Sequence, residues 1–231
     1  MAKNVLIIGA NRGIGLALAN EFRDQGWVVH GSIRPQTRGD PSAEELGCVA
    51  TKVLEIDYLD EKTIEQAANQ YGNEPLHCLV NCAGVSGGPL QWQSNDGEIF
   101  TRYFQTMVVG PVLATKHFER NLLLGENSKI VNISSICGSI SENDAGGKIA
   151  YKVAKAGLNQ ATRTIAMDFK KRGAFITTMS IDPGVVATRL NGWKSKVDVK
   201  DSVRGIYSVM DSTEFQDTGL FWSWNGLRIP Y

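Results

Sequence analysis

Hydrophobic residues gather in short runs along the chain, and the segments between the runs have helical spacing. An unbroken apolar run suits a parallel strand that is covered on both faces. Strands that alternate with helices form a parallel sheet with helices on both sides. The pattern therefore predicts an α/β, doubly wound (Rossmann) sheet of about seven mostly parallel strands. The predicted strands are Val5–Ile8, Trp27–Ile33, Val49–Ile56, Leu76–Val80, Lys129–Ile133, Phe175–Ile181 and Gly219–Trp222.

The segments between the strands carry the signals of amphipathic helices. Ile14, Leu18 and Phe22 recur every fourth residue and give one apolar stripe. Asp60 is a candidate N-cap for the helix that follows it. A longer stripe predicts a helix that ends near Gly173, and its residues are Ala154, Leu158, Ala161 and Ile165. In a sheet of this kind, ligands bind at the carboxyl ends of the strands.

Length and composition fit one such unit. The chain has 231 residues, of which 42% are hydrophobic and 21% charged, and no linker-like stretch or charge block divides it. We therefore expect a single domain over residues 1–231. Its 24 basic and 24 acidic residues leave no net field that would attract nucleic acid or an anionic membrane. Neither is expected as a partner.

Cysteine usage and the N-terminal run bear on location. Cys48, Cys78, Cys82 and Cys137 form no C-x-x-C pair, which indicates reduced thiols and a cytoplasmic protein. The first apolar run is too short for a signal-peptide core, and no run reaches membrane-spanning length. The three histidines lack the spacing of metal ligands, so no metal site is predicted.

The first predicted strand runs into a glycine-rich turn, Gly9-Ala10-Asn11-Arg12-Gly13-Ile14-Gly15. Glycines permit a tight turn and let the backbone approach a pyrophosphate at the N-terminus of the next helix. The spacing differs from the G-x-G-x-x-G fingerprint, so an ordinary strand-to-helix connection is the alternative. The place of the turn, directly between the first strand and a helix, favours dinucleotide binding.

The end of the second strand indicates which dinucleotide binds. Folds that prefer NAD place a carboxylate there to hold the adenosine ribose 2′-hydroxyl. This chain has Ser32-Ile33-Arg34 instead, and Arg12 lies in the glycine turn. Two guanidinium groups could clamp a 2′-phosphate; the alternative is that both are solvated surface residues. The pattern favours NADP(H) as the cofactor.

Tyr151 and Lys155 lie four residues apart on the long predicted helix and therefore share one face. A free phenol has a pKa near ~10 and exchanges protons poorly at neutral pH. A neighbouring ammonium and a nicotinamide cation would stabilise the phenolate and lower that pKa, as general acid–base catalysis requires. Taken alone, the Y-x-x-x-K spacing is common enough to favour two unrelated surface residues.

Further motifs surround this pair in order. Asn81-Cys82-Ala83-Gly84 closes the fourth strand, and the fifth ends in Ser134 and Ser135. The sixth strand is followed by Asp182-Pro183-Gly184-Val185-Val186-Ala187-Thr188. With the glycine turn and Y-x-x-x-K, these motifs cover essentially the whole chain. The sequence resembles the classical short-chain dehydrogenase/reductase family.

The resemblance implies catalytic roles for three residues. Tyr151 would protonate a carbonyl oxygen as hydride arrives from the nicotinamide, and Lys155 would bind the nicotinamide ribose and lower the pKa of Tyr151. Ser135, rather than Ser134, matches the serine that hydrogen-bonds the substrate carbonyl, because adjacent strand residues face opposite sides.

The resemblance also implies the cofactor contacts. Asp57 would lie beside the adenine, Asn81 and Gly84 beside the adenosine ribose, and Val186 and Thr188 at the carboxamide and pyrophosphate. The full implied set is Gly9, Asn11, Arg12, Gly13, Ile14, Gly15, Arg34, Asp57, Asn81, Ala83, Gly84, Tyr151, Lys155, Pro183, Gly184, Val186 and Thr188.

The end of the chain points to one branch of the family. Residues 221–226 and 229–231, with Gly110-Pro111-Val112, resemble the small carbonyl reductases of the sniffer and C-factor type. That branch implies reduction of a small aldehyde or ketone with NADPH. Homo-oligomers, dimers or tetramers, that pair through the two central helices are common in the family.

Two positions depart from the family pattern. Ile8 replaces a threonine whose hydroxyl braces the glycine turn. Met107 aligns with an asparagine that anchors a water through which Lys155 exchanges protons with solvent, and a thioether cannot replace that amide. Alternatively, Met107 only fills a gap beside its helix. We predict a working but slowed reductase; the competing class is a catalytically impaired NADP(H)-binding regulatory or signalling protein.

Apolar residues flank the predicted crevice, and a short substrate loop is expected near 188–200. Trp92 and Trp193, with Leu90, Pro89 and Leu190 nearby, could form a substrate wall, or could be partly exposed packing residues. The G-x-S-x-G pattern over 84–88 would suit a hydrolase, but the chain has no histidine late enough to complete such a site.

Overall fold

In a computed structural model of the protein, seven strands form one sheet in the order β3-β2-β1-β4-β5-β6-β7, and every neighbouring pair is parallel. The structure describes residues 2–85, 88–187 and 197–231. The chain reverses its direction of winding between β1 and β4, which places the ligand-binding edge there. The strands are β1 (Asn4–Ile8), β2 (Val28–Ile33), β3 (Lys52–Glu55), β4 (Cys78–Asn81), β5 (Lys129–Ile133), β6 (Thr177–Asp182) and β7 (Leu220–Ser223).

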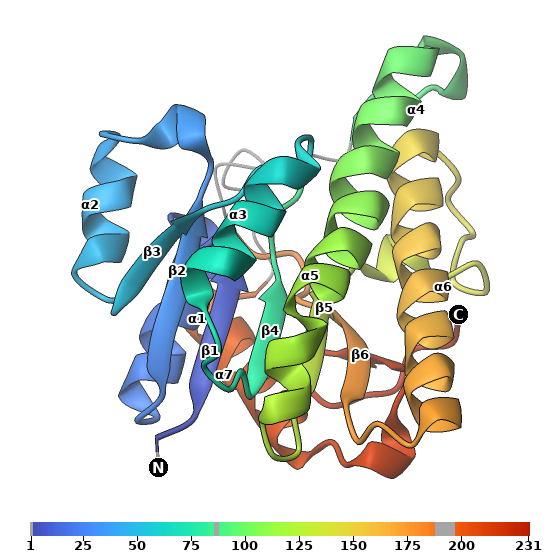
Figure 1. The fold of residues 1–231 in the computed structure, drawn as a ribbon. Helices are drawn as coiled ribbons and strands as arrows, with labels where there is room; N and C mark the ends of the chain where they lie inside the picture. The colour runs from blue at the N-terminus through green and yellow to red at the C-terminus, as the bar shows by residue number, and fades with distance from the viewer. Residues whose placement is uncertain (1, 86–87, 188–196) are drawn as a thin grey trace.

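Helices cover both faces of the sheet, as the sequence predicts (Figure 1). One face carries α1 (Gly13–Asp24), α2 (Pro41–Gly47) and α7 (Val199–Ser212). The other carries α3 (Glu61–Tyr71), α5 (Gly110–Leu124) and α6 (Ile149–Arg172). Among the described residues, no helix combines the length and apolarity that crossing a bilayer requires.

The remaining helical segments are short. α4 (Gly97–Phe104) continues without a break through the π-helical segment η3 (Gln105–Val109) into α5. Single 3₁₀ turns lie in the loops, at η1 (Pro35–Thr37), η2 (Trp92–Ser94), η4 (Ile136–Gly138) and η6 (Phe215–Asp217).

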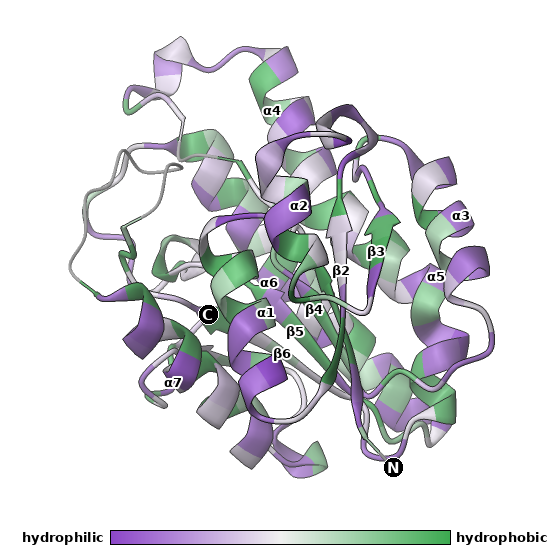
Figure 2. Ribbon diagram, turned by 90° about the vertical axis from the view of Figure 1, so that its left-hand side faces the viewer, coloured by the Kyte–Doolittle hydropathy of each residue, from purple (hydrophilic) through white to green (hydrophobic). Residues whose placement is uncertain are grey.

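β1 shows why the strands are apolar throughout. Val5 and Ile7 pack in the cluster beneath α1 and α7, whereas Leu6 and Ile8 pack in the cluster beneath α3 and α5. All four side chains are at most 1% exposed. Successive strand residues point to opposite faces, so a strand covered on both sides requires apolar residues at every position. Figure 2 shows the hydrophobic strands between the two helical layers.

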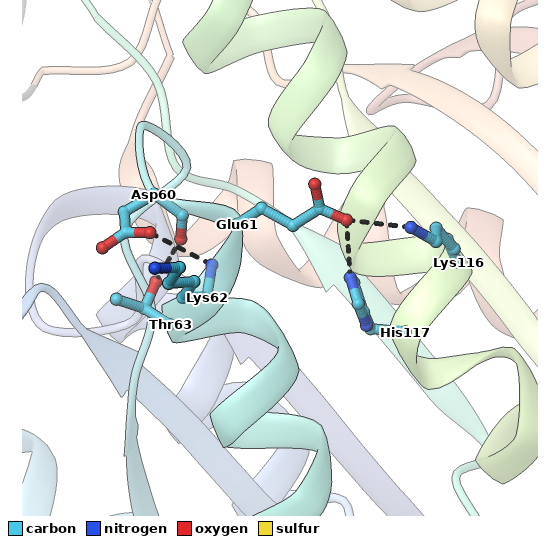
Figure 3. A network of polar contacts seen from close by, with 6 residues as sticks. All are labelled: Asp60, Glu61, Lys62, Thr63, Lys116 and His117. Carbon is cyan, nitrogen blue, oxygen red and sulfur yellow. Dashed lines mark hydrogen bonds and ion pairs between the residues drawn. The ribbon is translucent and has the colours of Figure 1, made fainter.

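Polar contacts fix the start of α3 and tie it to α5 (Figure 3). The Asp60 carboxylate accepts the backbone N–H of Lys62 at 3.1 Å, which confirms the predicted cap. The Glu61 carboxylate lies 2.9 Å from Lys116 Nζ and 2.9 Å from His117 Nε2, both on α5. His117 therefore has a structural partner, Glu61, in the outer helical layer.

Five of the predicted strands begin one to three residues too early, and two of them show why. The backbone N–H groups of Val49 and Ala50 donate to the Leu46 carbonyl, so these residues complete the end of α2 rather than starting β3. Phe175 is 69% exposed and precedes β6. An apolar run in the sequence does not show where the preceding helix or loop ends and where the strand begins. The long helix α6 ends at Arg172, and Gly173, with a φ of 70°, is its left-handed C-cap, as the sequence predicts.

Candidate active site

The glycine turn between β1 and α1 allows three backbone segments to meet. Gly9 and Gly13 have φ of 84° and 57°, a region that residues with a side chain rarely adopt. A Cβ on Gly15 would lie 2.1 Å from the Gly9 carbonyl oxygen, and a Cβ on Gly9 would lie 2.8 Å from the Ala83 Cα. The turn therefore packs directly on the loop after β4, at the switch point of the sheet.

The N-terminus of α1 has no internal anion. Its N-cap residue is Arg12, no side chain of the described residues caps it, and no acidic residue lies in its first turn. Neighbouring Asn11 is held by a hydrogen bond from its amide to the Ser42 hydroxyl, at 2.8 Å. The first backbone N–H groups of a helix have no partner within the helix and attract anions. The geometry therefore fits a pyrophosphate against this turn.

Ser32, on β2, braces the glycine turn. Its hydroxyl accepts the Gly9 N–H at 3.1 Å, and its carbonyl accepts the Ala10 N–H at 3.0 Å. The side chain is 1% exposed. Ser32 therefore supplies the turn with a side-chain hydrogen bond that Ile8 is unable to provide. The sequence signal that could have identified Ser32 is a hydroxyl-bearing residue in an otherwise buried strand.

Three charged residues follow β1, β2 and β3 on the adenosine side. Asp57 is 8% exposed, and its carboxylate accepts hydrogen bonds from the Gln36 amide and the Leu59 N–H, both at 3.0 Å. Arg34 and Arg12 are exposed, and neither forms an ion pair with a described residue. Their guanidinium groups are therefore available to a phosphate.

The side chain of Asn81 is turned into the fold. Its Oδ1 accepts the Tyr58 hydroxyl at 2.6 Å, and its Nδ2 donates to Asn132 Oδ1 at 2.7 Å. Asn132 in turn donates to the Thr162 hydroxyl on α6, at 2.8 Å. With its amide engaged in this way, Asn81 could contact a cofactor through its backbone, like Ala83 and Gly84, which carry little or no side chain.

α6 and the end of β5 bring the three predicted catalytic residues together. The Lys155 ammonium lies 5.9 Å from the centre of the Tyr151 ring. The Ser135 hydroxyl faces the Tyr151 phenol closely enough to oppose a rise in its pKa. Ser134 points elsewhere and donates to Asn159 Oδ1 at 2.7 Å. Only the second serine of the pair therefore reaches the tyrosine.

Burial sets the protonation of the pair. It raises the pKa of Tyr151 to about 12, which is opposite to the lowering by Lys155 that the resemblance implies, because desolvation of the phenol outweighs every other influence on it. Burial also lowers the pKa of Lys155 to about 8. At pH 7 the phenol is protonated and the ammonium is mostly charged. The ammonium is 6% exposed and donates to the Ile133 carbonyl at 2.7 Å. An ammonium carries three donors, so two remain for other partners.

Met107 lies in the π-helical segment η3, 1% exposed. It packs with Tyr103 and Val108 on its own helix and with Ala150 and Ala154 on α6. It thus fills space against the helix that carries Tyr151. π-helical segments are frequent at functional sites.

The loop after β6 is held from two sides. The Pro183 carbonyl accepts the Ser202 hydroxyl at 2.7 Å, and a Cβ on Gly184, which has φ of 76°, would lie 2.9 Å from Trp224 Nε1. Val186 forms a bridge with Val197. The predicted contacts at Thr188, Leu190 and Trp193 lie outside the described residues, as does Ser86 of the G-x-S-x-G pattern.

Two residues of the predicted apolar wall are largely exposed. Leu90 and Trp92 have exposed fractions of 69% and 66%. The Leu90 carbonyl accepts the Lys148 N–H at 3.2 Å, which places Leu90 near the start of α6, three residues before Tyr151. The structure thus leaves Leu90 exposed near Tyr151, the predicted catalytic tyrosine.

Known proteins share this sequence pattern and fold. The short chain dehydrogenase family matches residues 3–197. C-signal of Myxococcus xanthus is 32% identical over 157 residues, which span 68% of this chain and 93% of that protein. Carbonyl reductase Sniffer of D. melanogaster has a TM-score of 0.91 at 24% identity, over 100% of both chains. The NADPH-bound carbonyl reductase from chicken fatty liver has a TM-score of 0.88 at 24% identity, over 100% of this chain and 99% of that one. The chain belongs to the short-chain dehydrogenase/reductase family of NAD(P)-dependent oxidoreductases.

Proposed function

We propose that this protein is an NADPH-dependent reductase that converts an aldehyde or a ketone to an alcohol. The contact between the Ser135 hydroxyl and the Tyr151 phenol, on the helix face shared with Lys155, carries the proposal. These groups are the donor, the orienting hydroxyl and the cation that carbonyl reduction requires.

The residues divide the chemistry among them. Bound NADPH supplies the hydride that the carbonyl carbon gains. Ser135 orients the carbonyl oxygen by a hydrogen bond, and Tyr151, protonated at neutral pH, gives that oxygen its proton. The Lys155 ammonium stabilises the phenolate that remains. The two ammonium protons that Ile133 does not accept are available to the ribose hydroxyls.

The choice of NADPH is supported by two arginines that form no ion pair within the described part of the chain. Arg12 and Arg34 follow adjacent strands, and no carboxylate stands at the end of β2. A 2′-phosphate would gain charge-assisted hydrogen bonds from both. The glycine turn would hold the pyrophosphate, and Asp57 would border the adenine. The chicken carbonyl reductase of similar fold binds NADPH.

The substrate and the setting follow from the surroundings of the site. The exposed Leu90 and Trp92 favour a substrate with an apolar body.

We further propose a homo-oligomer that pairs through α4 and α6, where Phe104 and Val153, both about half exposed, line a shallow hollow. The four free cysteines support a reducing, cytoplasmic setting.

A second candidate is an NADP(H)-binding signalling protein with weak turnover. Met107 favours it, because a buried thioether replaces the amide through which the family resupplies protons. The similarity to a protein named C-signal points the same way.

One experiment separates the two candidates. NADPH oxidation would be followed with a panel of aldehydes, ketones and quinones, using the wild type and Tyr151→Phe, and NADPH binding would be measured by fluorescence. Turnover that Tyr151→Phe lowers at least about a hundredfold, without loss of binding, supports the reductase. Tight binding without turnover that depends on Tyr151 supports the signalling protein.

A further inference from the structure

β6 ends in a buried carboxylate that joins two loops of the site. Asp182 is 8% exposed. Its Oδ1 accepts the Ile136 N–H at 2.8 Å, and its Oδ2 accepts the Gly184 N–H at 3.1 Å. Ile136 directly follows Ser135, and Gly184 lies in the loop assigned to the nicotinamide end of the cofactor. One side chain therefore fixes the relative position of both loops.

Asp182 also acts electrostatically on the catalytic pair. The titratable groups that act on Tyr151 are Cys137, Asp182 and Tyr103, and those that act on Lys155 are Cys82, Asp182 and Cys137. Among the described residues, Asp182 is the only carboxylate that acts on Tyr151 and the only one that acts on Lys155. Its own pKa is raised by burial, and the two N–H groups and Lys155 oppose that rise by favouring the charged form.

The need for an anion follows from the burial of the ammonium. Burial lowers the pKa of Lys155 to about 8, so the charge would be lost only slightly above neutral pH. A nearby carboxylate acts against this effect by stabilising the ammonium. Met107, which packs against α6, has only a thioether sulfur, and this weak acceptor does not stabilise an ammonium as a carboxylate does.

We propose that Asp182 is a positioning residue for the reduction, which holds the Ser135 loop against the Gly184 loop and presents its negative charge to the Lys155 ammonium. This inference rests on the proposed function for its consequence in turnover. It assigns a role to the strand-end carboxylate itself, which touches neither substrate nor hydride.

The test replaces the charge and keeps the shape. Asp182→Asn retains one acceptor oxygen but removes the anion, which lowers the pKa of both Lys155 and Tyr151. Reduction requires a charged ammonium and a protonated phenol, so the alkaline limb of the kcat profile should move to lower pH by about 1 pH unit. A merely structural role would lower kcat at every pH without moving that limb, and this outcome would overturn the proposal.

Asp57→Asn is the matched control. Asp57 also follows a strand, is also 8% exposed and also accepts two hydrogen bonds, but it is not among the groups that act on Tyr151 or Lys155. Its replacement should raise the KM for NADPH and leave the alkaline limb in place. A shift of that limb as large as the one in Asp182→Asn would refute a specific role for Asp182.

A readout without turnover separates this inference from the proposed function. The pKa of Lys155 would be measured by NMR of its labelled ε-carbon in the cofactor-free protein, with Lys155→Met to assign the signal. In Asp182→Asn, or in Asp182→Ser if the amide disturbs the loops, the pKa should fall below the wild-type value. An unchanged pKa refutes the role of Asp182, whatever the substrate. A lowered pKa in a protein that reduces no carbonyl supports that role and refutes only the proposed function.

Discussion

Replacing Lys155 with methionine should abolish reduction and stabilise the fold. Burial lowers the pKa of the ammonium from 10.5 to about 8, and a difference of this size means that the charged form costs about 3 kcal/mol in the folded protein. Methionine has a similar length and no charge, so it removes that cost. Loss of the hydrogen bond to the Ile133 carbonyl offsets about 1 kcal/mol. The expected gain is about 2 kcal/mol at pH 7, or roughly 4–8 °C in Tm.

The gain should depend on pH in one direction. Below pH 8 the lysine is protonated in both the folded and the unfolded chain, so the wild type bears the full cost. Between pH 8 and pH 10.5 the folded protein releases the proton while the unfolded chain retains it, so the stability of the wild type rises with pH. The advantage of Lys155→Met should therefore shrink as pH rises from 7 towards 10.

The assay is thermal unfolding of the cofactor-free proteins at pH 7 and near pH ~9.5, together with NADPH oxidation at pH 7. Lys152→Met is the control, because Lys152 lies on the same helix but its ammonium contacts Asn143 at the surface. That change should alter stability by no more than about 0.5 kcal/mol. A Lys155→Met protein that is less stable than the wild type at pH 7, or whose advantage does not shrink with pH, would refute the reasoning.

Other predictions test the rest of the site. Gly15→Ala places a Cβ 2.1 Å from the Gly9 carbonyl and should cost about 1–3 kcal/mol in thermal unfolding; Gly97→Ala, where a Cβ meets nothing within 4 Å, should be neutral. Arg34→Gln should raise the KM for NADPH about tenfold and leave the KM for NADH unchanged. Arg38→Gln is the control, because the Arg38 guanidinium is paired with Glu55, and it should change neither KM. An Arg34→Gln effect of equal size on the KM values for NADPH and NADH would contradict the phosphate clamp. Met107→Asn should raise kcat while lowering stability by about 1–3 kcal/mol because it buries an amide; an unchanged kcat with a good substrate would show that proton resupply is not limiting.

The sequence predicted what depends on local pattern. Unbroken apolar runs predicted the strands, and the four-residue spacing placed Tyr151 and Lys155 on one face of α6. Motif order identified the family. These features are carried by residues near one another in the chain, or by an order that the fold must preserve.

What the sequence did not predict depends on which segments pack together. Ser32 braces the glycine turn because β2 lies beside β1, and the register of that pair is not written in either strand alone. Asp182 was visible only as part of a motif, since its role depends on the loop after β5 approaching the loop after β6. Asn81 was expected beside the adenosine ribose, yet its amide is engaged by Tyr58 and Asn132 from other strands and loops.

Transfer of deuterium is the most direct test of the central claim. NADPH that carries deuterium at both hydrogen positions of the nicotinamide C4 would be incubated with the protein and a carbonyl compound that supports turnover, and the alcohol would be analysed by mass spectrometry. If Ser135, Tyr151 and Lys155 form a reductase site, the alcohol carries one deuterium at its carbinol carbon, and Tyr151→Phe forms little of it. An alcohol without deuterium, or labelled alcohol formed equally fast by Tyr151→Phe, would contradict the proposed function.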